Sequence, residues 1–186
     1  MPFISEILEF NRNFVENKSY EAFDTTRFPD KRIAILSCMD TRLTELLPAA
    51  LNFKNGDIKI IKNAGAMITH PYGSVMRSML VAIYELGVQE ILVIGHYGCG
   101  MKNLDSTALI EKMKENGITQ DQIDLVLADG IDIHKWLSGF DNPVSSVSET
   151  VDLIKNHPLI SADLNVYGFL MDPHTGKLDP IESESE

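Results

Sequence analysis

Two short apolar runs of strand type each lead directly to side chains that can bind a metal ion. The run IAIL at 33–36 leads to Cys38, and the run ILVI at 91–94 leads to His96 and Cys99. Short aliphatic runs of this kind are typical of buried strands in a parallel sheet. Ligands of open α/β sheets bind at the carboxyl ends of the strands. The two segments therefore predict both the kind of sheet and the edge that carries the chemistry.

The rest of the chain alternates strand and helix patterns, without an internal repeat or a linker. We expect strands at 33–37, 58–62, 90–95 and 163–170, with a short one near 178, and helices at 3–17, 43–51, 75–86, 104–116, 119–138 and 143–154. Ser74 is the expected N-cap of the third helix, and Asn142-Pro143 is expected to open the last. Such alternation implies parallel pairing through right-handed crossovers. The prediction is one α/β domain over residues 1–186, a mainly parallel central sheet flanked by helices.

Composition excludes several classes of function. The net charge of −11 argues against a nucleic-acid partner or an anionic membrane, since either needs a basic surface. No apolar run is long enough to cross a bilayer, and the N-terminus lacks a signal pattern, so a cytoplasmic location is expected. The acidic segment 182–186 is expected to be a solvated tail.

The two cysteines and the nearby histidine indicate a zinc site. Two thiolates from Cys38 and Cys99 with the imidazole of His96 are a typical zinc ligand set, and three protein ligands leave a fourth position open, as in catalytic sites. A disulfide is the competing interpretation, but the chain has no secretion signal to favour it. We therefore expect Zn²⁺ as the cofactor.

These residues resemble those of the β-class carbonic anhydrases. The family pattern Cys-x-Asp-x-Arg, Asn-Ala-Gly and His-x-x-Cys-Gly is present in order and with similar spacing, from about residue 34 to the turn near 175–178. The matching residues are Cys38, Asp40, Arg42, Asn63, Ala64, Gly65, His96, Cys99 and Gly100. Lys54 stands where plant-type members have a glutamine, so the short class is the better match.

The resemblance implies reversible hydration of carbon dioxide to bicarbonate by zinc-bound hydroxide. It also implies a homodimer or an assembly of dimers, because the family builds its active site at a dimer interface. In that family an N-terminal helix like the one expected at 3–17 packs on a partner subunit. Carbon dioxide is small and apolar, and we expect its pocket to involve Asn63, Ala64, Gly65 and Gly100, in the loops 63–67 and 98–101.

Asp40 and Arg42 are the expected catalytic pair. Two thiolates neutralise the charge of the zinc ion and weaken it as a Lewis acid, so a further group must help. Asp40 can accept the hydrogen bond of the zinc-bound nucleophile while Arg42 holds the carboxylate ionised. Alternatively, Asp40 can close the fourth position by binding zinc itself. The pair could also be purely structural, an interpretation that its spacing from Cys38 disfavours.

Three other functions stay open. Carbon disulfide and carbonyl sulfide hydrolases resemble the same family and use the same zinc ligands. A closed structural zinc site in a non-catalytic protein, and a redox switch made of Cys38 and Cys99, need no substrate. The histidines outside the motif, His70, His134, His157 and His174, have no pattern that places them near the zinc, so we assign no proton shuttle.

Overall fold

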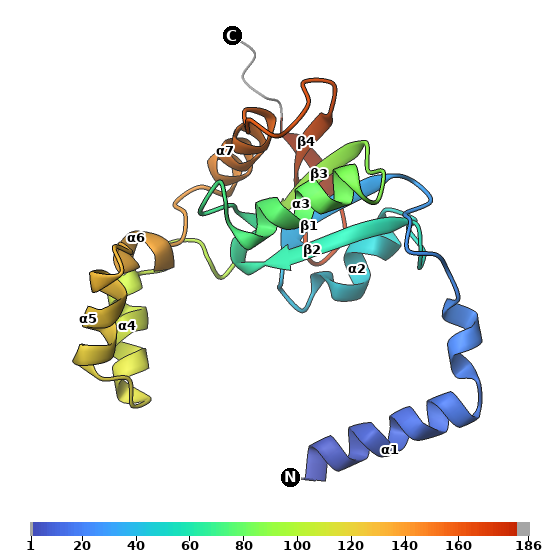
Figure 1. The fold of residues 1–186 in the computed structure, drawn as a ribbon, viewed down its shortest axis with the longest axis horizontal. Helices are drawn as coiled ribbons and strands as arrows, with labels where there is room; N and C mark the ends of the chain where they lie inside the picture. The colour runs from blue at the N-terminus through green and yellow to red at the C-terminus, as the bar shows by residue number, and fades with distance from the viewer. Residues whose placement is uncertain (1, 182–186) are drawn as a thin grey trace.

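A single five-stranded sheet organises the protein in the computed structural model, which describes residues 2–181 (Figure 1). The expected acidic tail at 182–186 lies outside the described residues. The strand order is β2-β1-β3-β4-β5. The strands are β1 (Ile33–Cys38), β2 (Ile58–Asn63), β3 (Glu90–His96), β4 (Asn165–Met171) and β5 (Leu178–Ile181). The first four pair in parallel and β5 pairs antiparallel with β4, so the predicted mainly parallel α/β fold is confirmed.

β1 lies at the centre of the sheet because both of its edges are paired, with β2 on one side and β3 on the other. Its residues Ala34, Ile35 and Leu36 are almost completely buried. Continuous apolar character, rather than alternation, is what a strand covered on both faces requires. The same reasoning applies to Ile91 and Ile94 of β3, which are inaccessible to solvent.

Helices cover both faces of the sheet. The helices described within residues 2–181 are α1 (Pro2–Glu16), α2 (Leu43–Ala50), α3 (Ser74–Tyr84), α4 (Ser106–Glu115), α5 (Gln120–Ala128), α6 (Ile133–Leu137) and α7 (Pro143–Lys155), with short 3₁₀ turns η1 (Ser19–Phe23) and η2 (Ala64–Ala66). The chain moves from β1 to β2 in one direction across the sheet and then reverses to reach β3 and β4. Right-handed crossovers therefore place α2 on one face and α3 and α7 on the other.

Two local expectations were wrong. The segment predicted as one helix at 119–138 forms two, because Gly130 adopts a positive φ of 81° and Asp132 caps a new helix by accepting the Lys135 backbone N–H. Ser74 is the first residue of α3, and Gly73 occupies the N-cap position. The predicted start of α7 is confirmed, since the Asn142 side chain accepts the Val144 N–H and Pro143 begins the helix.

Two parts of the chain stand away from the sheet (Figure 1). Helix α1 extends from the body and exposes a row of large apolar side chains, including Phe3, Ile7 and Phe10. Helices α4, α5 and α6 form the second part, here called the α4–α6 lobe (residues 106–137), which has its own small core of Ile110, Ile123 and Ile133.

Candidate metal centre

Strand ends place the three expected metal ligands. Cys38 is the last residue of β1, and His96 is the last residue of β3, its neighbour in the sheet. After His96 the chain turns through Gly98, whose φ is +63°, and this turn brings Cys99 back over the strand ends. Residues 58 positions apart in the chain, Cys38 and His96, therefore meet because parallel strands end at one edge.

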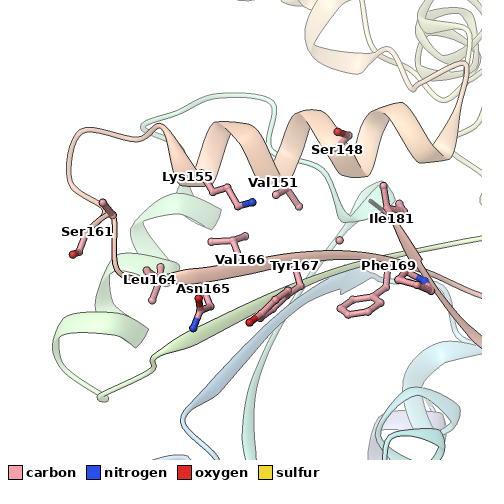
Figure 2. A pocket seen from close by; sticks show the side chains of 13 residues that line it. Ser148, Val151, Lys155, Ser161, Leu164, Asn165, Val166, Tyr167, Phe169 and Ile181 are labelled. Carbon is pink, nitrogen blue, oxygen red and sulfur yellow. The ribbon is translucent and has the colours of Figure 1, made fainter. Parts of the chain in front are cut away.

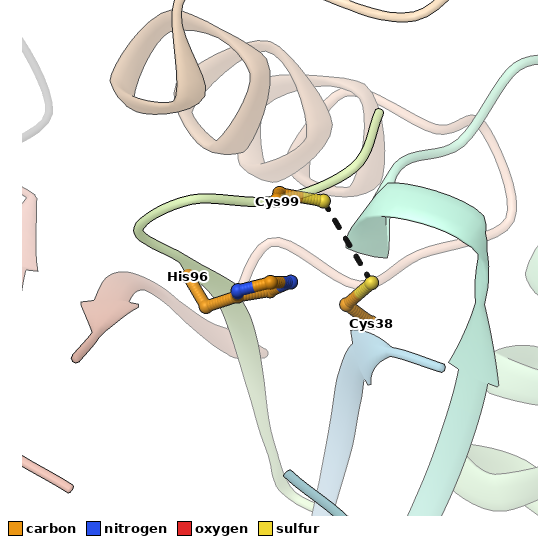
Figure 3. Close-up of side chains that lie close together, drawn as sticks. All are labelled: Cys38, His96 and Cys99. Carbon is orange, nitrogen blue, oxygen red and sulfur yellow. Dashed lines mark hydrogen bonds between the residues drawn. The ribbon is translucent and has the colours of Figure 1, made fainter. Parts of the chain in front are cut away.

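The three side chains form a compact buried cluster (Figure 3). The two Sγ atoms lie 3.8 Å apart, and these atoms and a ring nitrogen of His96 all lie within 4.8 Å of one another. The exposed fractions of Cys38, His96 and Cys99 are 5%, 1% and 7%. Both cysteines are free thiols, so the disulfide interpretation is not supported by this geometry.

The imidazole of His96 presents an unused nitrogen. Its Nδ1 lies 3.0 Å from the Tyr97 carbonyl oxygen, which can only accept, so Nδ1 carries the hydrogen. That leaves Nε2 with the lone pair, and this buried atom has no hydrogen-bond partner among residues 2–181. A buried acceptor without a partner is costly in a native fold, and a metal ion is the partner that this donor set fits.

The pKa values of the two thiols shift in opposite directions. The hydrogen bond between them lowers the pKa of Cys38 and raises the pKa of Cys99, whose proton is retained beside the first thiolate. Burial lowers the pKa of His96, but the nearby Cys38 sulfur and the Tyr97 carbonyl outweigh this effect, so the pKa is raised overall. A divalent cation held by Cys38, Cys99 and His96 would favour the thiolate form of both sulfurs, because metal ligands must be deprotonated.

Asp40 and Arg42 form a two-pronged ion pair beside this cluster. Arg42 donates from Nε to Oδ1 at 2.9 Å and from Nη2 to Oδ2 at 2.8 Å, and its backbone N–H adds a third bond to Oδ1. These bonds hold the pKa of Asp40 well below its usual range. Oδ2 lies 3.7 Å from His96 Nε2. The carboxylate thus lies at the edge of the cluster, ionised and oriented.

Arg42 also joins the two loops, since Nη2 lies 3.2 Å from the Gly98 carbonyl oxygen. A second cation, Lys62, donates from Nζ to the Cys38 carbonyl oxygen at 3.2 Å. Sequence reasoning missed Lys62. Lys62 directly precedes Asn63 and lies opposite Ser37 in the β1–β2 register, so its place at the site follows from the pairing of these two strands.

Of the four expected pocket residues, Asn63 and Ala64 line a hollow, whereas Gly65 and Gly100 are not part of its lining. Asn63 lies opposite Cys38 in the sheet, and Gly65 has a φ of +85° with the Met67 and Met101 side chains against it. Gly100 is exposed and faces open space. A hollow of about 290 Å³ is lined on the sheet side by Asn63, Ala64 and Met67, with Met101 between the sheet and the lobe.

Another hollow, of about 540 Å³, lies between α7 and the edge of β4 (Figure 2). Its lining contains serines, Lys155 and the β4 residues Asn165 and Tyr167, and none of the cluster residues. It therefore plays no part in the metal centre.

A parallel α/β sheet with two cysteines and one histidine at adjacent strand ends defines a class of mononuclear metal sites with an open face. Comparison with known proteins specifies the class further: the family model described as carbonic anhydrase matches residues 33–178. The chain belongs to the β-carbonic anhydrase family.

Individual relatives agree with this assignment. The Bacillus subtilis protein named "Putative carbonic anhydrase YtiB" is 52% identical over 181 residues, covering 97% of each chain. The crystal structure of β-carbonic anhydrase isoform I from Trichomonas vaginalis superposes with a TM-score of 0.87 at 34% identity, covering 97% of this chain and 98% of that one. A carbon disulfide hydrolase from Acidithiobacillus thiooxidans is 27% identical over 158 residues, covering 81% of this chain and 77% of that protein.

Among residues 2–181, no helix is both long enough and apolar enough to cross a membrane.

Proposed function

We propose that the protein is a zinc enzyme that reversibly hydrates carbon dioxide to bicarbonate. The observation that carries the proposal is the juxtaposition of the buried Cys38, His96 and Cys99 atoms with an ionised carboxylate held by Arg42. Cys38, His96 and Cys99 would hold the ion. When bound, zinc supplies a Lewis acid that lowers the pKa of a water molecule and so provides the nucleophile.

Asp40 and Arg42 position that nucleophile. Asp40 accepts a hydrogen bond from the attacking water or hydroxide, which aims an oxygen lone pair at the substrate carbon. Arg42 occupies both carboxylate oxygens and keeps Asp40 from taking up a proton. In this arrangement Asp40 is more suited to orienting the nucleophile than to binding zinc itself.

The test of the proposal is a stopped-flow assay of carbon dioxide hydration on protein of measured zinc content. We expect zinc near one equivalent per chain and a rate that rises as the pH increases from neutrality. Zinc content alone does not separate an enzyme from a structural zinc protein, so the rate is the deciding measurement. One equivalent of zinc without hydration at any pH would contradict the proposal.

Carbon disulfide hydrolysis is the second candidate function. The observation in its favour is the 27% identity to the carbon disulfide hydrolase of Acidithiobacillus thiooxidans. The 52% identity to YtiB favours carbon dioxide as the main substrate. Parallel assays with both substrates on one preparation decide between them: a larger kcat/KM for carbon disulfide would make it the substrate.

We also propose that the chain works as a homodimer. Phe3 and Phe10 of helix α1 are about 70% exposed. Large exposed apolar surfaces mark interaction sites, and a second copy of the chain would bury this one. Light scattering after size exclusion should give twice the chain mass, and Phe10→Asp should shift it toward the monomer. A wild-type chain that is monomeric at micromolar concentration would exclude the dimer.

A further inference from the structure

The turn between His96 and Cys99, residues 97–99, serves the metal centre from an exposed position. Tyr97 and Gly98 are exposed, and a Cβ placed on Gly98 would meet nothing within 4 Å. Three groups of the centre nevertheless depend on the course of this turn. The Tyr97 carbonyl lies 3.0 Å from His96 Nδ1, the Gly98 carbonyl accepts from Arg42, and Cys99 supplies a thiol. An exposed turn of this kind depends on hydrogen bonds more than on apolar packing for its position.

The β4–β5 hairpin holds the turn at Tyr97 through two hydrogen bonds. The backbone N–H of Tyr97 donates to the carbonyl of Met171, the last residue of β4, at 3.1 Å. The phenol of Tyr97 donates to Oδ2 of Asp179 in β5 at 3.1 Å. The register agrees with this, because Met171 lies opposite His96 in β3 and opposite Leu178, the neighbour of Asp179, in β5. The Tyr97 side chain therefore reaches from the end of β3, past β4, to β5.

Asp179 is held at its other oxygen as well. Lys177 Nζ lies 2.7 Å from Asp179 Oδ1, so the carboxylate meets an ammonium at one oxygen and the phenol at the other. Hydrogen bonding from Lys177 and, to a lesser degree, from Tyr97 lowers the pKa of Asp179. A hydrogen bond to an ionised carboxylate is stronger than one between neutral groups. Asp179 is therefore a charged and oriented anchor for the turn.

We infer that Tyr97 and Asp179 are positioning residues of the metal centre: their hydrogen bond holds the Tyr97 carbonyl against His96 Nδ1 and so keeps Nε2 directed at the ion. A carbonyl on the second nitrogen of a metal-binding histidine fixes the tautomer and the orientation of the ring. The anchor in β5 fixes the carbonyl in turn. The role rests on the proposed function, because it acts on a proposed zinc ligand, and it needs no contact of either residue with substrate.

Zinc affinity tests the role without any turnover. Tyr97→Phe removes only the hydroxyl, and competition with a chelator of known affinity should show zinc binding weakened by about tenfold, the lower end for groups that orient a metal ligand. Tyr167→Phe is the matched control and should bind zinc like the wild type. Tyr167 is 43% exposed, against 42% for Tyr97, and lies in β4, outside the turn.

The partner variants show whether the hydrogen bond itself is responsible. Asp179→Ala removes the acceptor and should weaken zinc binding as much as Tyr97→Phe does. The double variant should lose no more than either single variant, because both changes break the same bond. Lys177→Met removes the neighbouring cation but keeps both partners of the bond, and should stay close to the wild type. Asp179→Ala also carries the test if Tyr97→Phe does not fold.

The Nδ1–H proton of His96 gives a signature that a general loss of stability would not produce. In the zinc-loaded wild type, nitrogen-15 NMR should show this proton in slow exchange with water. The exchange should be faster in Tyr97→Phe and unchanged in Tyr167→Phe.

The measurements can overturn the role in three ways. Unchanged zinc affinity in folded Tyr97→Phe and Asp179→Ala would do so, and so would a double variant in which the two losses add. Weaker zinc binding with an unchanged Nδ1–H signal would show that the effect does not pass through His96. A wild type that binds zinc but hydrates no carbon dioxide contradicts the proposed function alone, and the zinc affinities then still decide the role of Tyr97 and Asp179.

Discussion

The buried cluster and the Asp40–Arg42 pair lie side by side but differ in their exposure to water and in the elements that position them. Cys38, His96 and Cys99 are at most 7% exposed and are positioned by strands at the centre of the sheet. Asp40 and Arg42 lie in the loop after β1 and remain in contact with water. The comparison shows a buried set of metal-binding atoms beside a charged pair that water can reach, so the two parts of the site can be altered separately.

The largest expected effect comes from removing a cluster ligand. Cys38→Ser, Cys99→Ser and His96→Ala each remove one of three protein ligands, and the remaining two should no longer retain the ion during dialysis. We expect less than a tenth of an equivalent of zinc by atomic emission, and no hydration activity. Circular dichroism serves as the control for folding. Full zinc retention in any folded variant would show that the ligand assignment is incorrect.

The pair should behave differently. Asp40→Asn and Arg42→Ala leave the three ligands intact, so zinc should stay near one equivalent. Hydration should fall by about a hundredfold, the lower range for a positioned group that acts on proton transfer or orientation. Arg42→Lys is the matched variant, because it keeps the charge but cannot make the two-pronged pair, and it should recover only part of the rate. Loss of zinc from Asp40→Asn would instead make Asp40 a ligand.

Much of the fold around the metal centre was predictable, because apolar strand segments and metal-binding side chains can be recognised in short stretches of sequence. The apolar runs at 33–36 and 91–94 correctly predicted β1 and β3, and the carboxyl-end rule brought Cys38 and His96 together. Strands β1, β2 and β3 each end one residue later than expected, so that Cys38, Asn63 and His96 are themselves the last strand residues. Strand β4 begins two residues later and ends one residue later than the expected 163–170.

Features set by long-range contacts were not predictable. Nothing local in the sequence shows that Arg42 reaches the Gly98 carbonyl or that Lys62 reaches the Cys38 carbonyl, because both depend on which strands become neighbours. The break between the two helices within 119–138 depends on Gly130 and Asp132, two residues that do not interrupt the helical pattern of the sequence. The hollow between the loop after β2 and the α4–α6 lobe depends on how the lobe, with its own small core, is joined to the sheet.

A smaller effect tests how tightly the loop after β2 is packed against the cluster. Gly65→Ala places a Cβ about 3.1 Å from Met101 Cγ in a residue with φ of +85°, so both backbone strain and crowding act. Gly117→Ala has φ of +96° with nothing within 4 Å, and reports the backbone term alone. We expect the backbone strain alone to lower the free energy of unfolding, measured in urea, by about 1–2 kcal/mol. If Gly65→Ala lowers the free energy of unfolding by more than Gly117→Ala does, the difference is the cost of the contact with Met101. Equal losses would mean that the Met101 side chain moves aside without a measurable cost.

The smallest effect is on protonation of the pair. Hydrogen bonds from Arg42 lower the pKa of Asp40 from 3.8, so the carboxylate stays charged in the folded protein after it would be protonated in the unfolded chain. The stability it contributes is complete above pH 3.8 and is lost as the pH falls through the lower, folded-state value. Carbon-13 NMR titration should show the pKa of Asp40 rising toward 3.8 in Arg42→Ala. Asp172 is the internal control: its pKa is lowered by the backbone N–H groups of His174 and Thr175 and should not change. An unchanged pKa of Asp40 would mean that something other than Arg42 keeps the carboxylate ionised, and the separation between a dry cluster and a charged, solvated pair would need another cause.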